Sequence, residues 1–277
     1  MLSGKTTLIA HLGYPTEAFK APMIYNPWFE SRGIDAVVVP MGVRAPDYAL
    51  VLDALARLTN LRGALVTMPH KVATLALVAE ATPAARIAGA CNALLRRPDG
   101  SWLGEQFDGT GFVRGVLRQR RTIDGNRVFV AGCGGVGSAI AAAMAQAGAA
   151  QISLFDERAE AAAALCGRLL EHYPRLEIRV GSADPAGHAI VVNATPLGMN
   201  DGDPLPFDID RVARDALVGE VVMKTEYTPL LRAAQARGCA VQVGTDMLFE
   251  MIPAYLEFFG FGSATPDELR ATARVRY

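Results

Sequence analysis

The chain has 277 residues, enough for one large or two modest domains, and 51% of them are hydrophobic, so it can bury a sizeable core. Its net charge of −1 comes without a basic patch or a charged tail, which argues against nucleic acid as a partner. No apolar run approaches the roughly 20 residues of a membrane helix, and the start lacks the apolar core of a signal peptide, so we expect a cytoplasmic protein with no membrane partner.

The first hundred residues alternate apolar runs with stretches of helical spacing. We expect strands at 7–12, 36–41 and 63–67, and helices at 21–32, 47–58 and 72–78. The pair Asp99-Gly100, between apolar runs at 92–96 and 102–104, indicates a hairpin. This alternation predicts an α/β block with a mostly parallel sheet.

A glycine-rich turn at mid-chain is the strongest single signal. An apolar run at 127–131 leads into Gly132-x-Gly134-x-x-Gly137, and an alanine-rich segment at 138–147 ends at Gly148. Strand, turn and helix in that order are the setting of a dinucleotide-binding fingerprint. The first glycine allows the tight turn, the second admits the pyrophosphate, and the third lets the helix pack on the strand. A tight turn without a ligand is the alternative.

The glycine turn belongs to a second α/β block, which predicts a Rossmann-type dinucleotide-binding domain. Its further strands are expected at 151–155, 176–180, 189–193, 217–223 and 240–243, with a helix at 160–172. The tail from Met247 is apolar and helical, and we expect it to pack on the first block. The predicted domains are therefore 1–108 plus 246–277, and 109–245, which contains the dinucleotide-binding fingerprint. Four scattered cysteines without metal-like spacing predict reduced thiols and no metal site.

Several short motifs, in order along the chain, together resemble the shikimate/quinate dehydrogenase family. They are Gly13-x-Pro15, Lys20-x-Pro22-x-x-x-Asn26, Val66-Thr-x-Pro-x-Lys71, Gly89-Ala-x-Asn92, Asp108-Gly-x-Gly111, the glycine turn, Asn193-Ala-Thr-Pro-Leu-Gly-Met199, Thr228-Pro-Leu-Leu231 and Gly244-x-x-Met247. The resemblance covers nearly the whole chain. It implies two α/β domains around a cleft, with 1–108 plus 246–277 as the substrate-binding and catalytic domain and 109–245 as the NAD-binding domain. It also implies reversible hydride transfer between NAD and a ring hydroxyl of a cyclic hydroxy acid.

Lys71 and Asp108 match the catalytic pair of that family. Oxidation of a secondary alcohol requires removal of its proton as hydride leaves, and a lysine held by a carboxylate can relay that proton. The alternatives are a solvated lysine at a helix start, where a cation is poorly placed, and an aspartate that only shapes a turn.

The substrate positions are partly kept and partly changed. Thr67 and Asn92 match residues that bind substrate hydroxyls, although each fits an ordinary strand or turn role as well. Phe19 and Ala21 stand where the family has two serines that hold the substrate carboxylate, and Met251 replaces a glutamine. Apolar or altered residues also replace polar ones at Leu65, Gln106, Phe107 and Met223. We therefore expect shikimate to be a poor substrate, and a less polar or differently anchored molecule to be preferred. In the alternative, Phe19 points into the core and Lys20 or Lys224 anchors the carboxylate.

Asp156 ends the strand after the glycine turn, where a carboxylate accepts hydrogen bonds from the cofactor ribose and repels a 2′-phosphate. This favours NAD over NADP, although Arg158 could turn toward a phosphate. The resemblance extends the expected cofactor contacts to Gly132, Gly134, Gly135, Val136, Gly137, Asn193, Thr195, Met199, Met223 and Gly244.

The sequence leaves two other functions open. A regulator that binds NAD without catalysis would share the fold but has no need of Lys71 and Asp108. A methylene-tetrahydrofolate dehydrogenase-like enzyme also pairs two α/β domains, and fits the motifs less well.

The expected partner is a small-molecule substrate, with room for a homodimer. His70 is expected to face solvent, although it could instead tune Lys71, and His11 is expected to be a satisfied core histidine.

Overall fold

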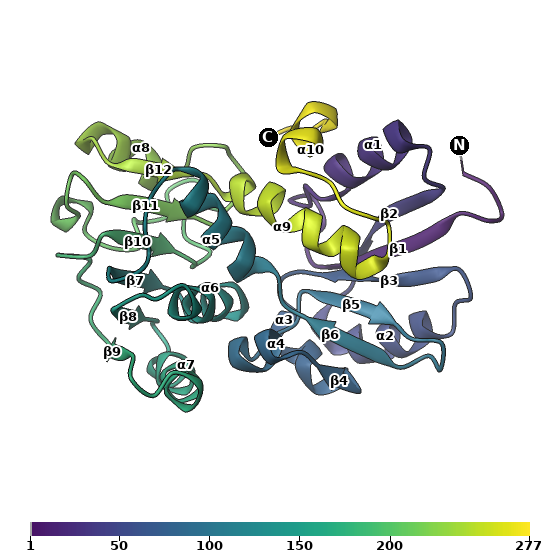
Figure 1. Ribbon diagram of the computed structural model, residues 1–277, viewed down its shortest axis with the longest axis horizontal. Coiled ribbons are helices and arrows are strands. Elements are labelled where there is room, and N and C mark those ends of the chain that lie inside the picture. Colours follow the sequence, from purple (N-terminus) through teal and green to yellow (C-terminus); the bar gives the residue numbers. More distant parts are fainter. Residues whose placement is uncertain (1) are drawn as a thin grey trace. The chain divides into compact units, whose positions relative to one another are not determined.

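The computed structural model describes residues 2–277, which form two compact units (Figure 1). Unit 1 contains the chain up to Arg86, Ala90–Phe107 and Met251–Arg276. Unit 2 contains Ile87–Gly89, Asp108–Glu250 and Tyr277. Each unit is built on a six-stranded sheet. The fold class expected from the sequence is confirmed, and the domain boundaries given above stay predictions.

The sheet of unit 1 is mixed. Its strands are β1 (Thr7–Gly13), β2 (Ala36–Gly42), β3 (Leu61–Val66), β4 (Glu80–Ala81), β5 (Ala93–Arg96) and β6 (Trp102–Glu105), in the order β2-β1-β3-β5-β6-β4. The first three are parallel, whereas β5 runs antiparallel to both of its neighbours. The expected β5–β6 hairpin is present. The two-residue strand β4 was not expected, because so short a segment carries no periodicity.

Short helices connect and cover these strands. They are α1 (Pro22–Arg32), η1 (Ala45–Asp47), α2 (Tyr48–Ala56), α3 (Lys71–Thr74), η2 (Leu75–Leu77), α4 (Pro83–Ala88) and α10 (Pro266–Thr272). The helix expected at 72–78 is in fact one α-helical turn followed by a 3₁₀ turn. As a result, Lys71 begins the first turn directly after β3 and its cis Met68–Pro69 peptide.

The two faces of the unit 1 sheet have different neighbours. Ala10, Leu12 and Val66 point to the face covered by Tyr48 and Leu52 of α2. Because side chains alternate along a strand, residues at odd positions of β1, and of β3 from Gly63 onward, point to the opposite face, whereas Leu61 precedes a register shift and packs on the α2 side. There a Cβ at Gly63 would lie 2.6 Å from the ring of Phe259, in α9 (Gly244–Phe259). The apolar tail therefore packs on unit 1, as the sequence predicts.

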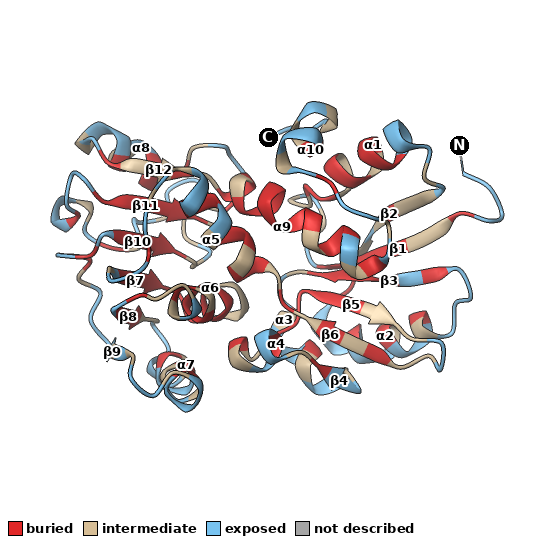
Figure 2. Cartoon of the chain, in the orientation of Figure 1, coloured by how far each residue is buried: buried red, intermediate tan, exposed pale blue. Residues whose placement is uncertain are grey.

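The sheet of unit 2 is entirely parallel. Its strands are β7 (Arg127–Ala131), β8 (Gln151–Phe155), β9 (Glu177–Val180), β10 (Ile190–Asn193), β11 (Leu217–Glu220) and β12 (Ala240–Gln242), in the order β12-β11-β10-β7-β8-β9. Numbered from β7, this is the 3-2-1-4-5-6 order of a Rossmann fold. Figure 2 shows β10 and β11 buried along their whole length, as expected for central strands covered on both faces.

The helices of unit 2 are α5 (Asp108–Arg118), α6 (Gly135–Gln146), α7 (Ala159–His172), η3 (Ile209–Arg211), α8 (Pro229–Arg237) and the first turns of α9. The sequence analysis did not identify α5 or α8. Helix α5 packs very closely on α6, since a Cβ at Gly109 would lie 2.1 Å from the carbonyl oxygen of Ala139. Within residues 2–277, none of the helices combines the length and the apolar composition that a membrane crossing requires.

Candidate functional site

The glycine turn of unit 2 has the geometry that dinucleotide binding requires. Gly132 has φ 95°, which favours glycine, and a Cβ there would lie 2.7 Å from the carbonyl of Ala194. A Cβ at Gly137 would lie 1.8 Å from the oxygen of Gly132, so only glycine lets α6 sit so close to β7. At Gly134, by contrast, no described atom lies within 4 Å of the Cβ position. Gly135 and Val136 then begin α6, whose first amides have no partner within the helix.

Asp156, just after β8, is tied to this turn. One carboxylate oxygen accepts the Cys133 N–H at 2.7 Å, and the other accepts the Arg158 N–H at 2.9 Å. The Arg158 side chain adds a looser ion pair, with 3.6 Å between Nε and Oδ1. Since a carboxylate offers about four acceptor positions, Asp156 can fix the turn and still accept a hydroxyl.

Glu220, at the end of β11, is a buried carboxylate that the sequence analysis missed. It is fully buried, and accepts hydrogen bonds from Asn193 Nδ2 (3.0 Å), Val221 N (3.0 Å), Val222 N (3.1 Å) and Thr228 Oγ1 (3.1 Å). Burial raises its pKa to about 7, although these donors oppose the shift. The carboxylate also explains why β11 stops at Glu220, short of the expected 223, because the next two amides turn toward it.

Asn193 extends this network into the loop after β10. Its side-chain oxygen accepts from Thr195 N (3.0 Å) and Thr195 Oγ1 (2.6 Å), and its amide also donates to the Leu197 carbonyl (3.1 Å). The Asn193 side chain is thus used inside the protein, where it holds the loop that leads to Met199. The Glu220 network likewise holds the start of the loop that contains Met223.

These loops, the glycine turn and Asp156 all follow the carboxyl ends of parallel strands. The last expected cofactor residue, Gly244, begins α9, and a Cβ there would lie 2.3 Å from the carbonyl oxygen of Val222. In a doubly wound sheet, ligands bind outside the carboxyl ends of the strands. In unit 2 the expected cofactor residues therefore all lie near the carboxyl-end edge of the sheet, and their role in binding stays a prediction.

Three expected residues of unit 1 gather where β1 and β3 end. Thr67 N–H donates to the Leu12 carbonyl at 2.9 Å, and Val66 N–H donates to the Asn92 carbonyl at 2.8 Å. The Lys71 carbonyl accepts the Cys91 N–H at 2.9 Å, so α3 is tied to the residue before Asn92. Hydrogen bonds thus bring the backbones of Thr67, Lys71 and Asn92 close together, and their catalytic and substrate-binding roles stay predictions.

Asn92 is also tied to the segment that ends in Asp108. Its side-chain oxygen accepts the Phe107 N–H at 2.9 Å, and the Tyr255 hydroxyl donates to its carbonyl at 3.0 Å. Its Nδ2 is buried and has no hydrogen-bond partner among residues 2–277. Asp108, the next residue after Phe107, is 1% exposed and begins α5, where the helix dipole favours a carboxylate.

Phe19 lies beside the Thr67 side chain and against His11. Its ring stacks on the His11 ring, with centroids 4.1 Å apart and planes inclined by 27°. A Cβ at Gly13 would lie 2.4 Å from the Thr67 methyl and 2.9 Å from the tip of the Phe19 ring. Among the other altered positions, Ala21, Leu65 and Met251 have buried apolar side chains.

The Lys20 ammonium binds the C-terminal segment of unit 1. It is 7% exposed, and its ammonium donates to the backbone carbonyl of Arg276 near the C-terminus. Burial lowers the pKa of Lys20. The lysine next to Phe19 therefore secures the tail of the chain, which weakens the alternative in which it anchors a carboxylate.

Both histidines of unit 1 differ from expectation. His70 is 1% exposed, its Nε2 lies 2.8 Å from the Val43 carbonyl, and its ring stacks on Tyr48 at 4.0 Å. The prediction that it faces solvent is wrong, because the turn after β3 folds the ring onto α2. His11 is buried as expected, but its Nδ1 has no hydrogen-bond partner among residues 2–277, so it is not satisfied.

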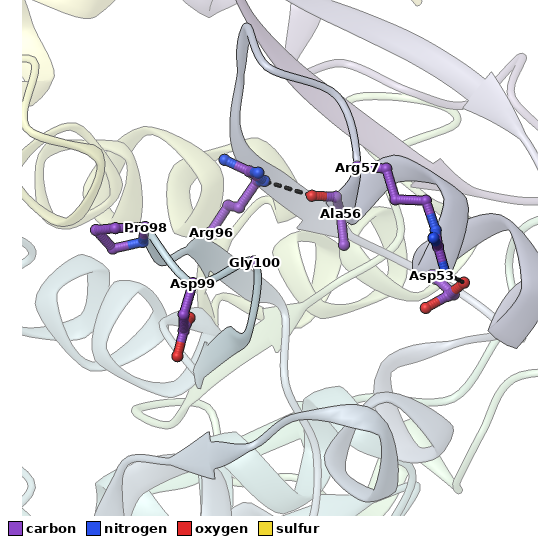
Figure 3. Close-up of a pocket in the computed structure, with 7 residues that line it drawn as sticks. All are labelled: Asp53, Ala56, Arg57, Arg96, Pro98, Asp99 and Gly100. Atoms are coloured by element: carbon purple, nitrogen blue, oxygen red, sulfur yellow. Dashed lines mark hydrogen bonds and ion pairs between the residues drawn. The ribbon is translucent and has the colours of Figure 1, made fainter.

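A hollow in unit 1 lies away from these residues (Figure 3). It is lined by Asp53, Ala56, Arg57, Arg96, Pro98, Asp99 and Gly100. Because β5 runs antiparallel to β3, the hairpin turn lies at the amino end of β3, opposite Thr67. Its charges serve local structure, with Arg96 Nε donating to the Ala56 carbonyl (2.6 Å) and Arg57 pairing with Asp53 (3.0 Å).

Comparison with known proteins finds shikimate and quinate dehydrogenases, and also a 5-ketofructose reductase of Gluconobacter sp., whose solved structure is 24% identical, with a TM-score of 0.84 over 98% of both chains. Residues 12–94 match the sequence model described as the shikimate dehydrogenase substrate binding domain. A shikimate dehydrogenase (NADP(+)) from Acidiphilium cryptum is 37% identical, over 99% of this chain and 98% of the relative. The solved quinate dehydrogenase from Corynebacterium glutamicum in complex with NAD is 28% identical, with a TM-score of 0.85 over 96% of this chain and 98% of that one. Shikimate 5-dehydrogenase from Listeria monocytogenes, solved with shikimate and NAD, is 26% identical, with a TM-score of 0.84 over 98% and 97%.

Proposed function

Because this chain belongs to the shikimate dehydrogenase family, we propose that it is an NAD-dependent oxidoreductase acting on a ring hydroxyl of a cyclic hydroxy compound. The hydroxy acids related to shikimate and quinate are the first candidates. The observation that carries the proposal is the grouping of Lys71 with Thr67 and Asn92 by backbone hydrogen bonds. The expected partner is a small-molecule substrate, and a cytoplasmic homodimer remains our expectation.

The cofactor site fits a nicotinamide dinucleotide. The space over Gly134 and the first amides of α6 suit a pyrophosphate, and the loops held by Glu220 lie along the same sheet edge. When bound, NAD supplies the acceptor for the hydride. The residues of unit 2 then bind and orient the dinucleotide.

Lys71 and Asp108 supply the proton chemistry in this proposal. In the oxidation direction the neutral amine of Lys71 accepts a hydrogen bond from the reacting hydroxyl and takes its proton as the carbon is oxidised, and in the reverse direction the ammonium returns that proton. Asp108 orients the Lys71 side chain and balances its charge. Thr67 and Asn92 hold neighbouring hydroxyls, so that the reacting carbon is correctly placed.

We propose a preference for NAD over NADP, on the basis of Asp156. A 2′-phosphate would meet this carboxylate, whereas ribose hydroxyls can donate to it. Relatives differ in this respect, since the Acidiphilium protein is named for NADP(+) and the Corynebacterium and Listeria structures hold NAD. Fluorescence titration with both cofactors tests the preference, and tighter binding of NADP would contradict it.

The test of the proposed function is NADH formation by the purified protein with shikimate, quinate and related ring alcohols, each with NAD and NADP. Turnover of at least one of them is expected. Binding of NAD without turnover of any would instead support the alternative of a non-catalytic regulator.

A further inference from the structure

His11 holds a buried polar atom that the fold does not satisfy. The residue is 7% exposed, and Nδ1 has no partner among residues 2–277. A buried nitrogen without a hydrogen bond is costly, and such atoms in native proteins call for an explanation such as a ligand. In the register of the sheet, His11 pairs with Leu65 on β3, so it shares the face on which Thr67 lies.

Residues that the family motifs assign to the substrate lie around His11. Phe19, in the place of a carboxylate-binding serine, stacks directly on the imidazole. The positive charge of Lys71 is close enough to influence His11, and the Phe19 ring reaches the Thr67 side chain around Gly13. His11 is therefore next to a residue of the proposed relay and a residue expected to bind hydroxyls.

The imidazole is neutral in the folded protein. Burial, and secondly the charge of Lys71, lower the pKa of His11 to about 3. A neutral imidazole pairs well with an uncharged hydroxyl, carbonyl or amide. A carboxylate at the same place would meet Phe19 and Ala21 in place of hydroxyl donors, and Lys20 is held by Arg276. Desolvation of a carboxylate is costly without such partners.

We propose that His11 is a substrate-binding residue, that it hydrogen-bonds an uncharged oxygen or amide of the substrate, and that the site prefers neutral ring polyols over their carboxylates. This rests on the proposed function and refines its substrate class. Phe19 packs against the apolar face of the ring, and Nδ1 of His11 takes the place of the missing serine hydroxyls.

The experiment compares shikimate with its carboxamide, which has the same shape and no charge. We measure kcat and KM for both with the full-length protein and NAD, and their affinity for the NAD-loaded protein by calorimetry. The wild-type protein is expected to favour the carboxamide by at least about tenfold in kcat/KM. A preference for shikimate would overturn the proposal.

His11→Leu and His11→Asn test the residue itself. His11→Leu should raise KM for the carboxamide about tenfold or more, with kcat and NAD affinity little changed. It should fold at least as stably as the wild type, because it removes an unpaired buried nitrogen. His11→Asn should recover part of the affinity, since its amide reaches the region of Nδ1. Unchanged KM in His11→Leu would overturn the proposal, because Nδ1 would then contact only water or protein.

Arg44→Ala controls for a different anchor. Arg44 is exposed and lies over the Tyr14 ring, 5.5 Å from its centroid, so it is a cation that a carboxylate could still recruit. The Arg44→Ala variant should bind and turn over both compounds as the wild type does, and selective loss of shikimate affinity would contradict the proposal.

If neither compound is turned over but the carboxamide binds in a His11-dependent way, the proposed function fails and this inference stands. If neither binds, the inference fails.

Discussion

The buried polar groups near the two candidate binding regions are used differently. In unit 2, Glu220 is fully buried and accepts from four donor groups, and Asn193 uses both its amide and its oxygen. In unit 1, His11 and Asn92 each keep one buried nitrogen without a partner among residues 2–277. Such atoms are not confined to the candidate site or to unit 1, since Tyr25 Oη and Trp28 Nε1 of unit 1 and Arg237 Nε and Gln242 Oε1 of unit 2 also have no partner among residues 2–277. Our proposals assign cofactor binding chiefly to backbone geometry, and substrate choice to a few side chains.

The largest expected effect comes from the proton relay. Lys71→Met should lower kcat by about 100- to 10,000-fold, the usual range for general acid–base assistance, while the affinity for NAD stays the same. Steady-state turnover and cofactor titration measure the two quantities separately. The exposed Lys5→Met is the matched control and should behave like the wild type. Near-normal turnover in Lys71→Met would place the proton route elsewhere.

Restoring the carboxylate site should have the next largest effect. The double variant Phe19→Ser with Ala21→Ser should raise kcat/KM for shikimate by roughly 100-fold, because each hydrogen bond to a charged group contributes about 1.5–3 kcal/mol. The same variant should lose affinity for the neutral carboxamide, since Phe19 no longer packs on the ring. No gain for shikimate would mean that these two positions do not set the specificity.

Glu220 and His11 are both buried and titratable, and each should change the free energy of unfolding with pH in the direction opposite to the other. The pKa of Glu220 is raised to about 7, so the folded state holds a proton that the unfolded state loses near pH 4.5. Its contribution to stability is therefore present below about pH 4.5 and is lost as the pH rises toward 7. Urea unfolding of the wild type and Glu220→Gln from pH 5 to 8 should reveal a change of roughly 2 kcal/mol in their difference. A constant difference would contradict the raised pKa.

His11 should show the reverse trend. Its pKa is lowered to about 3, so the unfolded state binds the extra proton between about pH 6.5 and 3, and stability falls as the pH decreases through that range. The difference between the wild type and His11→Leu should therefore change only on the acid side of pH 6.5.

The smallest expected effect concerns cofactor choice. Asp156→Asn should shift the ratio of NADP to NAD affinity about tenfold toward NADP, because the charge that opposes a 2′-phosphate is gone. Its carbonyl can still accept the Cys133 amide. Arg158→Ala is the companion variant. If it weakens NADP much more than NAD, Arg158 pairs with the phosphate and the proposed NAD preference is weakened.

Sequence reasoning was most successful where backbone requirements determine the residue. The turn at Gly132 requires a positive φ, and Gly137 leaves no room for a Cβ. Glycine at these two positions therefore indicates the turn between strand and helix from the sequence alone. Strands β7 and β8 were predicted at their observed bounds, because continuous apolar runs with sharp ends indicate buried parallel strands.

Side-chain partners across the fold were beyond the reach of sequence patterns. The burial of His70 on Tyr48 and the unsatisfied nitrogen of His11 both depend on residues distant in the chain. Glu220 was missed because it falls inside the strand predicted at 217–223, where a lone glutamate looks like a solvent-facing position. Helix α5 was missed because its first residues, Asp108 to Gly111, resemble a turn.

The central claim is that this chain keeps the proton relay of its family and has lost the site for a carboxylate. The most direct test is to assay it beside the Acidiphilium cryptum shikimate dehydrogenase, with shikimate and with both NAD and NADP. We expect its kcat/KM for shikimate to be at least about 100-fold lower than that of the relative, since two hydrogen bonds to the carboxylate are missing. Equal efficiency with shikimate would contradict the account.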